Sequence, residues 1–203
     1  MHIVDGALAN PVVIGGAVAA AGGIALGLRA MTMERIPAAG VLSAAFFVAS
    51  LVHVPIGPSS VHLILNGMAG LVLGWAAFPA LFVGLLLQAV FFGFGGVTVL
   101  GVNTFNIAMP AVIVGLVLGP LIRRGGAHAA IWGGVGGALA IALTTLCVAI
   151  CLALSGDQFL AAAKLVFLAH IPVMAVEAVL TAAAVSLALR VKPELFHVME
   201  TTR

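Results

Sequence analysis

A long run without charge is the feature that most constrains this chain, because residues 36–122 contain no Asp, Glu, Lys or Arg. A helix that crosses about 30 Å of hydrocarbon needs roughly 20 residues, so the run has room for about four crossings with short connections. Over the whole sequence 64% of residues are hydrophobic, 7% are charged, and mean hydropathy is +1.32. Soluble domains carry roughly 25% charged residues. The composition therefore predicts an all-α integral membrane protein.

Three further spans lie outside this run and end at charged residues. Residues 6–29 end at Arg29, residues 125–156 end near Asp157, and residues 158–189 end at Arg190. The total is about seven crossings, which we interpret as one transmembrane domain over residues 1–203. Pro, Gly and polar residues mark the breaks inside the uncharged run. The approximate spans predicted are 10–29, 36–55, 60–75, 78–95, 103–122, 128–154 and 159–190.

The basic residues predict the orientation, since Lys and Arg in short loops stay on the cytoplasmic side. A seven-span layout gathers nearly all of them on one side, namely Arg29, Arg35, Arg123, Arg124, Arg190, Lys192 and Arg203. Lys164, near the outer end of the last span, is the exception. The layout predicts an N-terminus outside and a C-terminal tail in the cytoplasm.

A cleaved signal peptide is the alternative interpretation of the first span, because its AVAAAG stretch resembles a small-residue cleavage site. Signal peptides begin with positive charge. Here the residues before the apolar run include Asp5 and no Lys or Arg. The pattern favours a retained first helix.

Small residues recur every four positions along the first span, at Gly15, Ala19, Gly23 and Gly27. Such a stripe lets two helices approach closely in lipid. Packing inside this protein's own bundle is the favoured interpretation, and a docking surface for another membrane subunit is the alternative. The GGVGG stretch at 133–137 leaves both open. Cys147 and Cys151, one helical turn apart, are interpreted as small core residues.

The predicted topology sorts the six histidines by depth. His2, His53 and His62 fall at the outer side, His170 lies deep in the last span, and His128 and His197 fall at the cytoplasmic side. Three imidazoles at one depth suggest a metal site. The segment LVHVPIGPSSVHLILNGM at 51–68 carries two of them in a Pro-interrupted hairpin, and such breaks occur at membrane depth where they line a cavity or are buried in protein.

His2 has a special position next to the first residue. A free terminal amine, the His2 backbone nitrogen and the His2 ring can bind one metal and close two fused chelate rings. Both main-chain nitrogens must lose protons to the metal. A planar set of nitrogen donors suits Ni(II) or Cu(II) better than Zn(II), which prefers a tetrahedron. One equatorial place then remains for another imidazole.

MHIVDGAL at the start, HVPIGPSSVHL and FGFGGVTVLGVNTFN at 92–106 resemble the CbiM/NikM family, the substrate-binding subunits of energy-coupling-factor importers for cobalt and nickel. The resemblance covers nearly the whole chain. It implies a seven-helix subunit whose N-terminal segment is tucked into its own centre. It also implies the metal ligands Met1, His2 and His62, which requires that Met1 is retained and deformylated.

Other polar residues near these ligands are candidates for supporting roles. His53 either hydrogen-bonds near the site, lines the path of the incoming metal, or is a simple buried histidine. Metal-bound imidazoles usually donate their other N–H to an acceptor, and the candidates for holding the ligands in this way are Asp5, Ser60, Asn66, Asn103 and Asn106. Thr98 and Asn103 alternatively satisfy the backbone of their own loop.

Two ionisable residues, His170 and Glu177, lie seven positions apart on one face of the last span. Such groups in the membrane are costly and often functional. We predict that they form a polar pair facing the bundle, with a proton relay or a subunit contact as the alternative.

The sequence thus predicts a non-enzymatic receptor for Ni²⁺ or Co²⁺, the transported substrate, with no organic cofactor. The chain has no GxxxxGK[ST] phosphate loop, so ATP hydrolysis is assigned to partners. By resemblance these are a transmembrane coupling subunit and cytoplasmic ATPases, with a separate small auxiliary membrane subunit, in the inner membrane of a prokaryote. Nickel is favoured over cobalt, because a planar nitrogen set suits it and the HVPIGP hairpin resembles the nickel-type branch.

Two other classes of function are alternatives for this sequence. A stand-alone proton-coupled metal carrier or channel would use Glu177 and His170 as its relay. An intramembrane hydrolase is disfavoured, since HExxH and GxSxG are absent. The sequence contains nothing that indicates a nucleic-acid partner.

Overall fold

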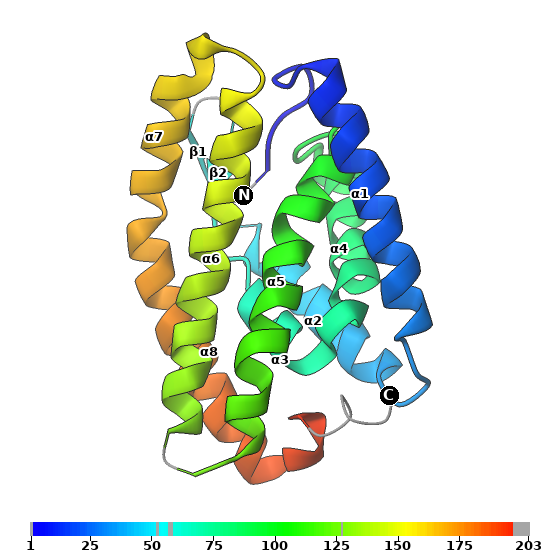
Figure 1. Ribbon diagram of the computed structural model, residues 1–203, viewed down its shortest axis with the longest axis vertical. Helices are drawn as coiled ribbons and strands as arrows, with labels where there is room; N and C mark the ends of the chain where they lie inside the picture. Colours follow the sequence, from blue (N-terminus) through cyan, green and yellow to red (C-terminus); the bar gives the residue numbers. More distant parts are fainter. Residues whose placement is uncertain (1, 52, 57–58, 127, 197–203) are drawn as a thin grey trace.

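The computed structural model describes residues 2–51, 53–56, 59–126 and 128–196. Met1, His197 and Arg203, which the sequence interpretation used, lie outside the described residues. Apart from one short antiparallel hairpin, the regular structure of the described part is helical (Figure 1).

The first half of the chain contains α1 (Asn10–Arg29), α2 (Ile36–Ala49), β1 (Val54–Ile56), β2 (Ser59–Val61), α3 (Asn66–Leu73), the 3₁₀ turn η1 (Gly74–Ala76) and α4 (Ala77–Phe92). The second half contains α5 (Leu100–Arg123), α6 (Ala129–Ala153), η2 (Asp157–Phe159), α7 (Leu160–Ala169), α8 (Ile171–Val191) and η3 (Pro193–Phe196). In the hairpin, Val54 pairs with Val61 and Ile56 with Ser59.

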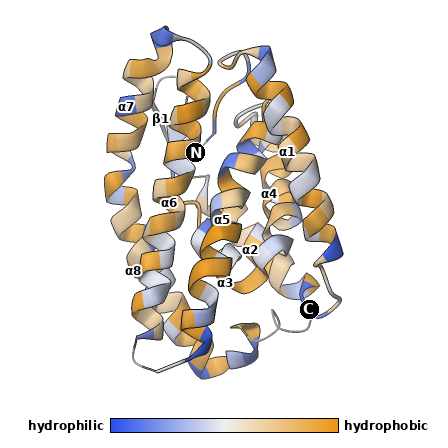
Figure 2. Cartoon of the chain, viewed as in Figure 1, coloured by the Kyte–Doolittle hydropathy of each residue, from blue (hydrophilic) through white to orange (hydrophobic). Residues whose placement is uncertain are grey.

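Five stretches of the described chain are long and apolar enough to cross a membrane: Asn10–Arg29, Asn66–Phe92, Leu100–Arg123, Ala129–Ala153 and Asp157–Val191. The apolar helix α2 is shorter. Hydrophobic residues cover the helices along most of their length, and hydrophilic residues gather toward the two ends of the bundle (Figure 2). The prediction of an all-helical membrane protein is confirmed.

The stretch Asn66–Phe92 is not one straight rod, because the chain reverses at Gly74, whose φ of 57° and ψ of −126° end α3. Asn66 hydrogen-bonds to Ile107 and Gly70 packs on Ala111, so α3 runs in the same direction as α5. α4 starts beside Gly27 and ends near His2, so it returns toward the N-terminal end. The two halves therefore form an antiparallel pair.

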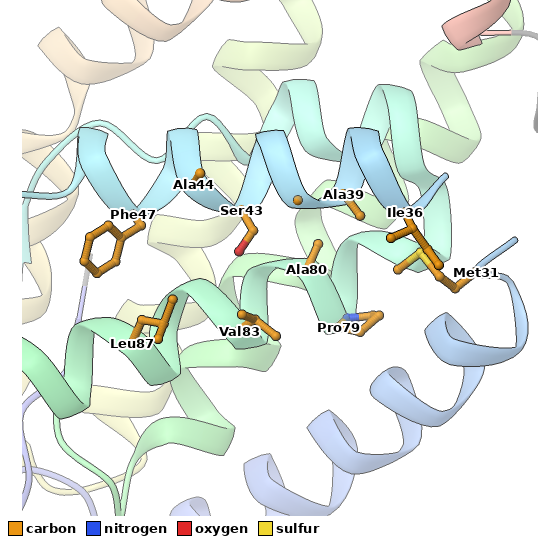
Figure 3. Close-up of a pocket in the computed structure, with 11 residues that line it drawn as sticks. Met31, Ile36, Ala39, Ser43, Ala44, Phe47, Pro79, Ala80, Val83 and Leu87 are labelled. Carbon is orange, nitrogen blue, oxygen red and sulfur yellow. The ribbon is translucent and has the colours of Figure 1, made fainter. Parts of the chain in front are cut away.

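α2 and α4 run side by side in the same direction, as Figure 3 shows. Ile36 lies near Pro79 at one end of the pair, and Phe47 lies near Leu87 at the other. α2 therefore rises toward the same end of the bundle that holds the β-hairpin.

Two predicted spans differ from the structure in the middle of the uncharged run. The span predicted at 36–55 is helical only to Ala49, and that predicted at 60–75 starts as strand β2 and is helical from Asn66. Pro55 drives Val54 out of the helical region, so α2 cannot reach the predicted end of its span. The helices α1, α4, α5 and α6 match their predicted spans within a few residues. The last predicted span, 159–190, is broken at His170 between α7 and α8, where Pro172 opens the new helix.

Glycines allow the helices of the bundle to pack closely. Gly133 faces Val185 of α8 and Gly136 faces Val114 of α5, so GGVGG packs inside the bundle. The small-residue stripe of α1 is packed at one end only. Gly27 lies against Pro79, whereas a side chain at Gly15 would meet nothing within 4 Å. Internal packing thus accounts for GGVGG and for only part of the stripe.

The closest helix contact provides a stability prediction. A methyl group at Gly70 would collide with the backbone of Ala111, so Gly70→Ala must separate α3 from α5. Overpacking of this kind costs about 1–3 kcal/mol, and we expect a lower thermal midpoint and a lower folded yield in detergent. Gly15→Ala is the matched control and should lower neither, because its side chain meets nothing within 4 Å and alanine favours the helix. Equal stability of the two variants would show that this contact is not as tight as described.

Candidate metal centre

The start of the N-terminal segment, residues 2–8, enters the bundle, whereas Val4, Asp5 and Gly6 are exposed. His2 and Ile3 are buried. The N–H of Ile3 donates to Asn103 Oδ1, and Asn103 Nδ2 donates to the Ile3 carbonyl, both at 3.0 Å. Asn103 lies in the first turn of α5, so a single amide side chain holds the main chain next to His2. Burial in this part of the segment is therefore limited to His2 and Ile3, next to Asn103.

The glycine-rich loop after α4 fits around this segment. The Asp5 N–H donates to the Gly95 carbonyl, and the Asp5 carboxylate accepts hydrogen bonds from Thr98 Oγ1 and the Val99 N–H. Gly95 and Gly96 have φ of 77° and 122°, and a side chain at Gly96 would collide with the Asp5 carboxylate. Glycine is required here both for the backbone conformation and for the close approach.

The β-hairpin brings the second histidine to the same place. His62 directly follows β2 and is 3% exposed, and His2 is 4% exposed. Their rings stack with centroids 4.7 Å apart, and His62 Nε2 lies 3.2 Å from His2 Nδ1. Two nitrogen ligands at right angles on a metal, each about 2.0 Å from it, would be roughly 2.8 Å apart. The pair is therefore close to the separation that two adjacent metal ligands need.

Hydrogen bonds at the other ring nitrogens leave lone pairs on the two facing atoms. The Leu63 carbonyl can only accept, so His62 Nδ1 donates to it, at 2.7 Å. His2 Nε2 donates to Gln88 Oε1, at 2.6 Å. In these neutral tautomers His2 Nδ1 and His62 Nε2 face each other as two acceptors. A cation bound by both nitrogens would satisfy the two lone pairs.

Burial keeps the His2 imidazole uncharged. Desolvation lowers the pKa of His2 to about 4, with the hydrogen bond to Gln88 acting in the opposite direction and His53 lowering it further. At neutral pH this ring does not need to lose a proton before it binds a metal.

Gln88 is the site residue that the sequence interpretation missed. It is fully buried, and within α4 it stands alone as a polar side chain in the sequence AFPALFVGLLLQAVFF. An amide inside an apolar span is costly unless it is bonded or functional. That isolation was a signal that could have identified it.

The other predicted supporting residues differ in what they contact. Asn103 and Asp5 fix the N-terminal segment, as described above. His53 is half-buried and packs edge-on against Phe94, which is also near the His2 ring.

The remaining candidates bond to other parts of the bundle. Asn66 binds the Ile107 carbonyl and Thr144, and Asn106 contacts Cys151. Ser60 is buried in β2 opposite Pro55.

The structure gives His170 and Glu177 separate partners. His170 Nδ1 donates to the Val166 carbonyl, one turn back in α7, at 2.6 Å. The Glu177 carboxylate accepts from the main chain of Ile64 and Leu65. Both side chains are fully buried in the bundle, as predicted, but the described contacts do not join them as a pair.

No three His, Cys, Asp or Glu side chains among the described residues are grouped so that they alone could hold a metal. The two imidazoles would need main-chain donors to complete a site. A separate groove of about 420 Å³ lies between α2 and α4 (Figure 3), and the side chains that line it are apolar apart from Ser43. The histidine pair is therefore the candidate centre.

Comparison with known proteins finds relatives that are named for metal transport. A protein of Haemophilus influenzae named for metal transport is 42% identical over 97% of both chains. The cobalt transport protein CbiM of Sorangium cellulosum is 28% identical over 82% of this chain and 79% of its own. The fused nickel transport protein NikMN of Rhodobacter capsulatus is 38% identical, over 49% of this chain and 29% of its own.

Solved structures show the same fold. The crystal structure of a transition metal transporter superimposes with a TM-score of 0.81 and 26% identity, covering the whole of this chain and 99% of the other. A truncated transition metal transporter gives 0.79 and 27% over 94% of this chain and 99% of its own. The family described as the cobalt uptake substrate-specific transmembrane region, CbiM, matches residues 2–195. This chain therefore belongs to the CbiM family of substrate-specific transmembrane components of cobalt and nickel uptake, which are transport proteins and not enzymes.

Proposed function

We propose that this protein captures a divalent transition metal at the His2–His62 pair and delivers it as substrate to an ATP-driven importer. The observation that supports this most directly is the pair itself: two buried, neutral imidazoles with unshared lone pairs 3.2 Å apart. Membership of a metal-uptake family supports the same function independently.

The proposed donors are the Met1 amine, the His2 main-chain nitrogen, His2 Nδ1 and His62 Nε2. A chelate ring that joins the His2 main-chain nitrogen to its own imidazole has six members when it closes through Nδ1, which is the nitrogen that faces His62. Closure through Nε2 would need a larger ring, and that nitrogen is bonded to Gln88. The ring orientation of His2 therefore supports this donor set.

We further propose seven crossings with the N-terminal end outside. The chain alternates in direction through α1, α2, the hairpin with α3, α4, α5, α6, and α7 with α8. Arg29, Arg123 and Arg190 lie in the last turns of α1, α5 and α8, which run in one direction. Under the positive-inside rule this end is cytoplasmic and the histidine pair is at the outer side.

Nickel is the substrate that we favour over cobalt. Four nitrogen donors in a plane suit Ni(II), and among the relatives are proteins named for nickel transport. Copper would bind the same donors more tightly than either metal. Delivery and availability must therefore contribute to selectivity.

The partners that we propose are a transmembrane coupling subunit, cytoplasmic ATPases and a small auxiliary membrane subunit, with the whole chain acting as one metal-binding domain in the inner membrane of a prokaryote. The relatives named as fused NikMN proteins support association with a further component.

Metal binding to the purified protein tests the function. Isothermal titration in detergent should show one tightly bound Ni²⁺ or Co²⁺ per chain and weak binding of Mg²⁺ or Ca²⁺, which prefer oxygen donors. Absence of binding by the deformylated, untagged chain would overturn the proposal.

Gln88 provides a prediction specific to this site. Gln88→Leu removes the acceptor that orients His2, and loss of such a partner typically costs 10–100-fold in metal affinity, so we expect nickel affinity to fall by roughly that factor. Gln158→Leu, at an exposed position, is the matched control and should bind as the wild type does. Equal affinities for the two variants would exclude a role for Gln88.

A further inference from the structure

We propose that Glu177 is a positioning residue for the metal site, which holds His62 in place through the peptide group between Leu63 and Ile64. The inference rests on the proposed function of the histidine pair. It assigns to α8, far away in the sequence, a direct influence on a metal ligand.

The Glu177 side chain contacts the main chain just before α3. Glu177 Oε1 accepts hydrogen bonds from the N–H groups of Ile64 and Leu65, at 2.5 and 2.8 Å. Glu177 is fully buried, and its second oxygen has no partner among the described residues. A buried carboxylate normally has a strong compensating interaction. Here the interaction is with main-chain donors just before α3, at the helix end that favours negative charge.

Hydrogen bonds connect this contact to the proposed metal ligand His62. The N–H of Ile64 and the carbonyl of Leu63 belong to one peptide group. That carbonyl accepts the hydrogen bond from His62 Nδ1. A continuous chain of bonds therefore runs from the Glu177 carboxylate through one peptide to the His62 ring. The carboxylate orients the peptide and polarises it, which strengthens the carbonyl as an acceptor for the imidazole N–H.

The backbone beside this contact has an unusual conformation at Leu65. Leu65 has a φ of 56°, and it alone among the described non-glycine residues has a positive φ. L-residues rarely adopt this conformation, so surrounding contacts must maintain it. The hydrogen bond from its own N–H to Glu177 is such a contact.

Close packing of three helices fixes the position of Glu177. A side chain at Gly137 of α6 would lie 2.5 Å from the Glu177 carbonyl oxygen, and one at Gly67 of α3 would lie 2.8 Å from Gly137 Cα. The three helices therefore meet at Gly137 with little space between them. Glu177 is held on a packed framework, which gives the precision that a metal ligand requires.

The experiment compares the visible absorption of the nickel complexes of purified variants. Glu177→Asp keeps the charge, but its chain is one methylene shorter and cannot reach both N–H groups. We expect its nickel band to move to longer wavelength, toward that of His62→Ala, and its affinity to fall roughly 10–100-fold. Glu177→Gln keeps an acceptor oxygen and should retain the wild-type band. Thr181→Ala, one turn further along the buried face of α8, is the matched control and should also retain it.

Each outcome decides a separate point. If Glu177→Asp keeps the wild-type band and affinity, the positioning role is overturned. A band like that of His62→Ala in Glu177→Gln would also overturn it. The glutamine variant can be assessed even if the aspartate variant does not fold. If the wild-type protein itself binds neither Ni²⁺ nor Co²⁺, the proposed function fails instead.

Discussion

An N-terminal extension that converts the Met1 amine into a peptide bond should abolish tight binding of nickel and cobalt. The amine is one of four proposed donors, and its loss opens the first of two fused chelate rings. We expect the dissociation constant to rise on the order of a thousandfold, or about 4 kcal/mol. Isothermal titration of the purified protein measures it.

The extension must be designed with care. A single added residue would place the histidine third, where an amine, two amides and one imidazole form a four-nitrogen set without His62. An uncleaved extension of four residues that includes a proline avoids this, since proline has no N–H to give up. The same four residues added after Arg203 are the control. Tight binding by the N-terminally extended protein would refute the chelate.

Replacement of His62 by alanine should have the second largest effect. It removes the fourth donor and leaves the three nitrogens of the N-terminus, so that a weaker ligand such as water completes the plane. We expect affinity to fall by at least about 100-fold, beyond the usual effect of losing a residue that only orients a ligand. The nickel band should move to longer wavelength at the same time.

His53→Ala is the matched control for this variant, because His53 lies at the start of the same hairpin and contacts Phe94 instead of the pair. It should keep the wild-type band and most of the affinity. If the two alanine variants exchanged these behaviours, His53 would be the ligand and the assignment to His62 would be wrong.

The helices were largely predictable from the sequence, because each apolar segment selects the membrane by its own composition. The span 10–29 matches α1 residue for residue, and 103–122 lies inside α5. The segment from Ser50 to Leu65 was not predictable in this way, since apolar residues there fit a strand or a helix equally well. The reversal at Gly74, in contrast, lies at the break that the sequence predicted between the spans 60–75 and 78–95.

The candidate site was predictable only in part. His2 and His62 were identified by chain position and by resemblance, and the structure brings them together. Gln88 and the link from Glu177 to Ile64 were missed, and the predicted pairing of Glu177 with His170 was replaced by separate contacts. In each case the polar residue was visible in the sequence, but its partner was not.

The sequence by itself determined that this chain is a membrane protein with helices between clusters of charge, because the free energy of burying apolar segments in lipid is a sum over local residues. Only the tertiary structure decided which polar atoms meet. His2 bonds to a residue 86 positions away and Glu177 to one 113 positions away. Such contacts depend on how the helices pack, and in this bundle close approaches at Gly70 and Gly137 set that packing.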